Sequence, residues 1–135
     1  MKKKKILFIF IVVVISLLFG GAYYEYNKKA PEVASLSAQL VSAVDLFKDF
    51  TSNESLANEI YLNKALQVSG NVLEVKENNN KQLQIILDAG DPMFGIACTM
   101  DQSQKKIKPG DHVTIKGICT GYLNDVVIIK SLLLN

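Results

Sequence analysis

The chain contains two cysteines, Cys98 and Cys119, whose sulfur atoms are its strongest candidates for covalent chemistry. Each falls on the apolar side of an alternating segment, so both side chains are expected to point into a β-sheet core. In an exported domain such a pair is often oxidised, and a bridge closing a loop of about 20 residues would stabilise the fold by ~3 kcal/mol. The sequence favours this disulfide and leaves two buried thiols as the alternative. Two sulfurs with no histidine beside them do not complete a zinc site.

His112 is the only histidine, and no Ser-His-Asp or Cys-His arrangement can be built around it. It lies on the polar side of its segment, just after the turn at Pro109-Gly110, where a solvated imidazole is expected. Asp88 and Asp91 flank a glycine turn and Asp101 begins a polar connector, and their spacing does not match a calcium loop. The sequence therefore predicts no catalytic residue, no cofactor and no metal ligand, and we expect a protein that is not an enzyme.

The basic side chains are unevenly distributed, and none of them is arginine. Residues 1–30 carry six lysines and one glutamate, hence +5, whereas the rest carries nine lysines and twelve acidic residues, hence −3. Lys105, Lys106 and Lys108 form the only basic cluster outside the N-terminus. An acidic domain without arginine disfavours nucleic-acid binding, so we interpret this cluster as a solvated charge run.

Five β-strands are predicted in the second half of the chain, because apolar and polar residues alternate there. They cover residues 66–75, 82–87, 93–99, 111–120 and 126–134. Residues 77–81 form a hairpin loop, and residues 101–108 are a connector too short for more than one helical turn. Five short strands, with the longest connection between the third and the fourth, follow the order of an OB-fold barrel.

Two helices are expected before the strands. Apolar residues at steps of three and four predict an amphipathic helix from Val33 to Phe50. Ser52 or Asn53 can cap a second, shorter helix that ends near Tyr61. We interpret the apolar side of the first helix as the plug of an open barrel end, with a partner surface as the alternative. The predicted fold is therefore mainly β, an OB barrel with N-terminal helices.

Three stretches share a pattern with a narrower group of proteins. They are residues 53–70, Ile96-Ala97-Cys98, and residues 110–127, which begin with Gly-Asp-His-Val-Thr-Ile-Lys-Gly. Within residues 36–134 this combination resembles the tRNA_anti-like family of OB-fold proteins from bacterial envelopes. The resemblance implies the barrel and an exported or lipid-anchored protein, and it implies no activity or site residue. The family name reflects a likeness to tRNA-binding barrels.

The N-terminus combines four lysines with an apolar run. Lys2 to Lys5 precede residues 6–24, which carry no charge and as a helix span roughly 28 Å, close to the ~30 Å hydrocarbon core. The lysines favour a cytoplasmic N-terminus, and three tyrosines suit the far interface. We interpret the run as an uncleaved anchor, with a signal peptide cleaved near Gly20-Gly21-Ala22 as the alternative. No cysteine follows it, which excludes a lipoprotein anchor.

Residues 1–26 are therefore predicted as a single transmembrane helix, residues 27–35 as a short linker, and residues 36–135 as the helices and the barrel. The protein is expected in the inner membrane with its domain in the periplasm. We expect a non-enzymatic module that binds a peptide, a protein or a small molecule of the envelope. Oligonucleotide binding is the alternative, weakened because the predicted second and third strands contain one aromatic, Phe94, whose parity favours the core.

Overall fold

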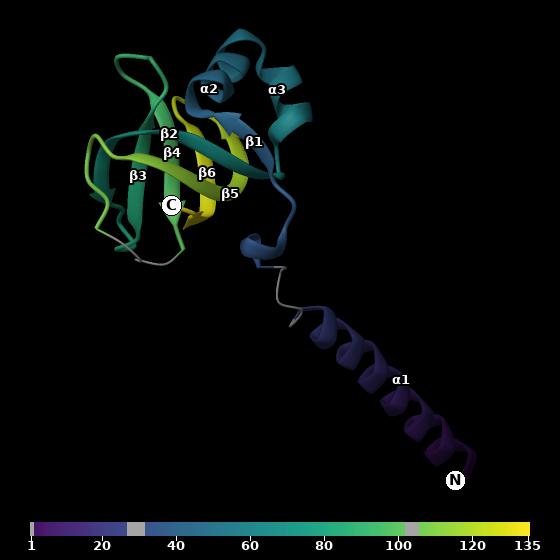
Figure 1. The fold of residues 1–135 in the computed structure, drawn as a ribbon. Helices are drawn as coiled ribbons and strands as arrows, with labels where there is room; N and C mark the ends of the chain where they lie inside the picture. The colour runs from purple at the N-terminus through teal and green to yellow at the C-terminus, as the bar shows by residue number, and fades with distance from the viewer. Residues whose placement is uncertain (1, 27–31, 102–105) are drawn as a thin grey trace. The chain divides into compact units, whose positions relative to one another are not determined.

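The computed structural model describes residues 2–26, 32–101 and 106–135. The chain divides into two compact units, residues 1–31 and 32–135, and we call the second the barrel unit (Figure 1). The first unit holds helix α1 (Lys2–Tyr26). Its segment Lys3–Gly21 has a mean hydropathy of 2.3 and is long and apolar enough to cross a membrane. This length and composition fit both a membrane anchor and a signal sequence, because both need an apolar helix.

Five strands close into a barrel in the second unit. They are β2 (Ala65–Glu77), β3 (Leu83–Asp88), β4 (Gly95–Met100), β5 (His112–Tyr122) and β6 (Val126–Leu133). The strand order is β2-β3-β4-β6-β5, and β2 closes the barrel by pairing with β5 as well as β3. The β4–β6 pair is parallel and the other barrel pairs are antiparallel. This topology confirms the predicted OB fold.

Strand β2 pairs with two barrel strands because it bends. Its first half pairs with β5 and its second half with β3, and a register shift between Val72 and Glu74 marks the bend. Such a bulge increases the local twist that barrel closure requires. Close packing also requires glycine at position 117 in β5, where a Cβ would stand 2.5 Å from Cγ2 of Ile128.

The segment before α3 differs from the predicted continuous helix. It forms a 3₁₀ turn η1 (Val33–Ser35), strand β1 (Gln39–Ser42) and helix α2 (Ala43–Ser52). Strand β1 pairs in parallel with β2, from Gln39 opposite Leu66 to Ser42 opposite Ser69. The Oγ atom of Ser42 accepts a hydrogen bond from the backbone N–H of Asp45 at 3.0 Å and so caps α2. The predicted helix was wrong up to Ser42, because pairing with β2 supplies backbone hydrogen bonds that outweigh the helical pattern.

Helix α2 plugs the barrel, as predicted. Leu46 and Phe50 are fully or almost fully buried in the common core, together with inward residues of all five barrel strands. Helix α3 (Glu54–Tyr61) packs on α2, and its N-cap Asn53 accepts a hydrogen bond from the N–H of Leu56 at 3.1 Å. The described residues of the β4–β5 connector form no helix, and Ile107 packs against the core instead.

The predicted disulfide between Cys98 and Cys119 is wrong, because both residues are free, buried thiols. They point into the core from β4 and β5, but β6 lies between these strands, and both cysteines stand opposite Ile128. With neighbouring strands about 4.8 Å apart, their Cα atoms are roughly 9–10 Å apart, beyond the ~7 Å limit for a disulfide. The alternative of two buried thiols therefore holds.

Candidate binding site

OB barrels often bind ligands on the outer face of their second and third strands, here β3 and β4. The register of this pair turns Gln84, Ile86, Ala97 and Thr99 outward. None of the four is aromatic or charged, and Ile86 and Ala97 are largely covered. Phe94, just before β4, is half-buried and packs against the core. This face therefore offers neither a platform for base stacking nor a cation for phosphate.

The other aromatic side chains of the barrel unit lie between the helices and β5. Phe50 stacks on Tyr122 with ring centroids 5.9 Å apart, and its ring lies 6.0 Å from that of Tyr61. The Tyr61 hydroxyl donates to Oδ2 of Asp49 at 2.7 Å. Burial, assisted by this bond, raises the pKa of Tyr61 to about 12. These rings hold α2 and α3 on the barrel and are not free to bind a ligand.

The polar residues that the sequence singled out form hydrogen bonds within the fold. His112 is exposed, and its Nδ1 lies 2.8 Å from Oδ1 of Asn71 on the neighbouring strand. Asp88 accepts the N–H of Gly90 at 2.8 Å, and Asp91 accepts two backbone N–H groups at 2.8 and 2.9 Å. These carboxylates hold their turns, as the sequence suggested. The structure also places Asp88 and His112 on one hollow of about 270 Å³, which the sequence did not indicate.

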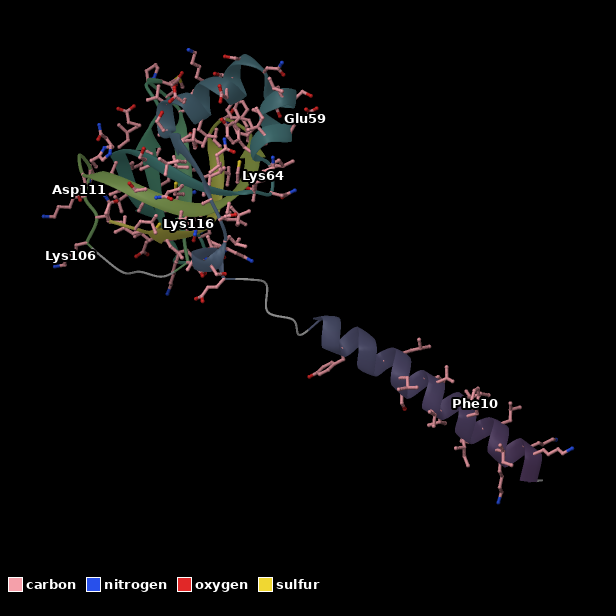
Figure 2. The ribbon with its side chains drawn as sticks, turned by 45° about the vertical axis from the view of Figure 1, so that its right-hand side comes forward. Phe10, Glu59, Lys64, Lys106, Asp111 and Lys116 are labelled. Carbon is pink, nitrogen blue, oxygen red and sulfur yellow. The ribbon has the colours of Figure 1, made fainter. Side chains whose placement is uncertain are left out.

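The predicted lysine cluster is exposed where it is described. Lys106 and Lys108 are exposed in the connector, and Lys106 extends away from the barrel (Figure 2). The backbone N–H of Lys108 donates to Oδ2 of Asp111 at 2.9 Å, so the acidic side chain orders this turn. Lys105 lies outside the described residues.

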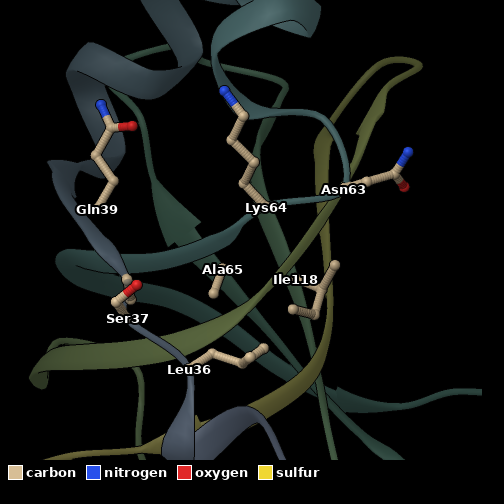
Figure 3. Close-up of a pocket in the computed structure, with 8 residues that line it drawn as sticks. Leu36, Ser37, Gln39, Asn63, Lys64, Ala65 and Ile118 are labelled. Atoms are coloured by element: carbon tan, nitrogen blue, oxygen red, sulfur yellow. The ribbon is translucent and has the colours of Figure 1, made fainter. Parts of the chain in front are cut away.

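A hollow of about 550 Å³ lies where β1 and β2 begin, and we call it the fork pocket (Figure 3). The parallel pairing of these strands starts at Gln39 opposite Leu66, so residues 36–38 and 63–65 flank the opening without pairing with each other. The pocket is lined by Leu36, Ser37, Ala38, Gln39, Asn63, Lys64, Ala65 and Ile118. No pattern in the sequence predicted this pocket, because its walls come from segments that only the fold brings together.

The fork pocket has an apolar base and polar arms. Leu36, Ala65 and Ile118 lie along its base, whereas the side chains of Gln39 and Lys64 both extend away from this base (Figure 3). Lys64 is the one charged residue of the lining, and its Nζ donates to the backbone carbonyl of Glu59 at 3.0 Å. Within the described part of the chain, no carboxylate forms an ion pair with Lys64. The pocket is therefore locally positive.

Strand β1 presents an unpaired edge on its side away from β2 and from this pocket. Among the described strands it pairs with β2 alone, at the end of the sheet. Its sequence, Gln-Leu-Val-Ser, contains no lysine, proline or acidic residue, which are devices that protect edges from further pairing. Leu40 is 73% exposed and Val44, just beyond the strand, is 50% exposed. This edge fits the mode of recognition in which an extended peptide adds a strand to a sheet.

Comparison with known proteins places the chain among OB-fold families. A profile of the tRNA_anti-like family matches residues 1–133. No curated protein sequence matches the chain. A similar solved structure is that of a "putative nucleic acid-binding lipoprotein" from Klebsiella pneumoniae, which is 16% identical, with a TM-score of 0.49. The match covers 80% of this chain and 100% of that chain.

Proposed function

The chain belongs to the tRNA_anti-like family, and we propose that it works as a non-enzymatic binding module of the cell envelope. In this proposal α1 is a single-pass anchor in the inner membrane, with its N-terminus in the cytoplasm and the barrel outside. Four lysines followed by the apolar segment Lys3–Gly21 support this orientation. A cleaved signal peptide is the alternative, and it would export the same domain.

The proposed ligand is an extended segment of another envelope protein, bound along β1. The unpaired edge of β1, with Leu40 largely exposed on it, is the observation that carries this assignment. A peptide strand would satisfy the backbone groups of that edge and cover Leu40 and Val44 in the same step. The outer face of β3 and β4 offers fewer contacts to a partner, because Ile86 and Ala97 are buried there and its one charged side chain, Asp88, is hydrogen-bonded within its turn.

Site-specific photo-crosslinking in the native membrane tests this function. Full-length protein with benzoylphenylalanine in place of Leu40 should form a discrete adduct with one partner protein. The matched control carries the same residue in place of Leu123, a leucine that is 84% exposed in the turn between β5 and β6. The partner, once identified and purified, should bind a Leu40→Lys variant more weakly than a Leu123→Lys variant. Equal adducts at both positions, or none at position 40, would contradict binding along β1.

Family membership favours a second candidate function, oligonucleotide binding, more directly than it favours peptide binding. The side chains oppose it, because the β3–β4 face has no aromatic or basic residue, its one charged residue is the acidic Asp88, and residues 31–135 carry nine lysines against twelve acidic residues. A salt-dependent affinity of the full-length protein for single-stranded RNA or DNA would establish this second function. We expect no such affinity at physiological salt.

A further inference from the structure

We propose that residues 33–38, which we call the strap, are a releasable fastening that sets how much chain separates the membrane anchor from the barrel. The change in reach rests on the anchor of the proposed function, whereas the release itself is a property of the barrel unit alone. The observations behind it are the place where the strap is docked, the few groups that hold it, and the firm attachment of the chain that follows.

The strap is docked on the outside of the barrel. Its 3₁₀ turn η1 packs on β5 and β6. Val33 is 6% exposed there, but it does not belong to the core cluster inside the barrel. The side chain of Lys116 points outward from β5, and its Nζ donates to the backbone carbonyl of Ala34 at 2.9 Å. The strap can therefore detach without exposing the core.

Few groups hold the strap in place. Within the described part of the chain, the bond from Lys116 is the one hydrogen bond that joins η1 to a barrel strand. The other bonds of η1 are internal, since the N–H of Ser35 donates to the carbonyl of Glu32 at 2.9 Å and that of Leu36 donates within the same turn at 3.2 Å. Apart from Val33, every residue of the strap is exposed or half-buried.

The contributions that dock and release the strap are similar in size. Docking buries one valine and forms one hydrogen bond from a charged group, and both stabilise the docked form. Docking also orders the backbone of the six residues 33–38, and this loss of conformational entropy opposes it. Local opening of the strap therefore needs much less free energy than unfolding of the barrel.

Opening stops where strand β1 begins. Residues 39–42 pair with β2, and Val41 packs against the core. Helix α2 follows directly and buries Leu46 in the barrel. Release of this later segment would break the sheet and remove the plug, whereas release of the strap does neither. The strap is therefore separable from the elements that follow it.

Release lengthens the chain between the anchor and the barrel. Helix α1 ends at Tyr26 and the docked chain begins at Val33, which leaves the six residues 27–32 between them. With the strap released, the first held residue is Gln39, and the twelve residues 27–38 lie between. Fully extended, these two lengths are at most roughly 20 and 40 Å. Release thus doubles the distance over which an anchored barrel can reach a partner.

Hydrogen exchange of the full-length protein in detergent tests the release. Peptides covering the strap should exchange at least tenfold faster than those of β4, because the strap opens without global unfolding. Lys116→Met should accelerate exchange of the strap about tenfold further, as expected for loss of a hydrogen bond from a charged group, and should leave β4 unchanged. Lys48→Met, at an exposed lysine of α2, is the matched control and should change neither rate. Strap exchange as slow as that of β4, or unaffected by Lys116→Met, would overturn the proposal.

Energy transfer to the membrane tests the change in reach. The full-length protein is placed in lipid nanodiscs that carry acceptor dyes on the head groups, with a donor dye on Leu123→Cys, an exposed position. Cys98 and Cys119 are buried and should not take up the dye. Addition of Lys116→Met should lower the transfer efficiency, whereas addition of Lys48→Met should not.

The two measurements separate the failure of each proposal. Equal transfer efficiencies in the two variants would overturn the change in reach. Absence of transfer in every variant would refute the anchor of the proposed function, and the change in reach with it. Exchange of the strap does not depend on the anchor, so the first experiment decides its release in either case.

Discussion

The two cysteines show how one neighbouring residue decides the chemistry of a pair. Cys98 and Cys119 both stand opposite Ile128, which separates them by two strand spacings. Burial raises the pKa of Cys98 to about 12 and also raises the pKa of Cys119. Because the thiolate is the reactive form, both groups are expected to be inert in the folded protein.

Thiol labelling tests this expectation. N-ethylmaleimide at pH 7 should label neither cysteine in the native protein, because the thiols are buried and protonated. After denaturation without a reductant, mass spectrometry should find two labels per chain. Labelling that occurs only after reduction would show that the two cysteines form a disulfide and would contradict this expectation.

The hydroxyl of Tyr61 supplies a pH dependence of stability. Its pKa is raised from 10.0 to about 12, so the folded form keeps its proton where the unfolded form loses it. Its contribution is fully present below pH 10 and is lost as the pH rises toward 12, since the unfolded state then binds fewer protons. Tyr61→Phe should lower the free energy of unfolding by about 1 kcal/mol at pH 7 and flatten its decline between pH 10 and 12. Denaturant titrations at several pH values measure both effects, and an unchanged slope would contradict the assignment.

At the scale of elements, α2 closes the open end of the barrel. In many OB folds a helix between the third and fourth barrel strands does this. Its apolar face fills the barrel, and Ser42 sets where it begins. Because β1 precedes it directly, the same short segment both plugs the barrel and presents a free edge. Core and candidate site are thus adjacent in the chain.

The plug can be tested by truncating one buried side chain. Leu46→Ala should lower the free energy of unfolding by about 2–5 kcal/mol, because Leu46 is fully buried in the core. Leu56→Ala, at a leucine of α3 that is 52% exposed, is the matched control and should cost less than about 1 kcal/mol. Urea unfolding of the two variants gives the comparison, and equal costs would mean that α2 does not plug the barrel.

The whole molecule consists of an apolar helix and a barrel unit that folds around its own core. A barrel tethered to a membrane needs no strong affinity of its own to meet a partner in the same membrane, because tethering raises the effective concentration. If α1 is retained as an anchor, this tethering favours the proposed binding function at the membrane.

The anchor and its orientation can be examined together. Mass spectrometry of protein extracted from membranes should find residues 1–26 intact. Cells whose outer membrane has been permeabilised are treated with a membrane-impermeant amine reagent. The reagent should label Lys106 and Lys108 but not Lys2 to Lys5. A mature mass that begins near Ala22 would establish a cleaved signal peptide, and labelling of the barrel only after lysis would place it in the cytoplasm.

The sequence by itself determined the features that depend on local pattern. Alternation with a period of two predicted the five barrel strands, and charge-free length predicted the apolar helix, because each follows from a residue and its near neighbours. Residues 33–42 were predicted wrongly, because Val33, Leu36 and Leu40 have helical spacing. Pairing with the edge of β2 makes strand β1 more stable than a helix there. The Ser42-Asp45 capping pair was the one local signal of where the helix begins.

Only the tertiary structure decided which strands are neighbours, and one correction and one new site follow from that. Inward parity placed both cysteines in the core, but the insertion of β6 between β4 and β5 keeps them apart. The fork pocket likewise joins residues 36–39, 63–65 and Ile118, which are distant in the chain. Strand pairing over long separations depends on the closure of the whole barrel, so no local pattern encodes it.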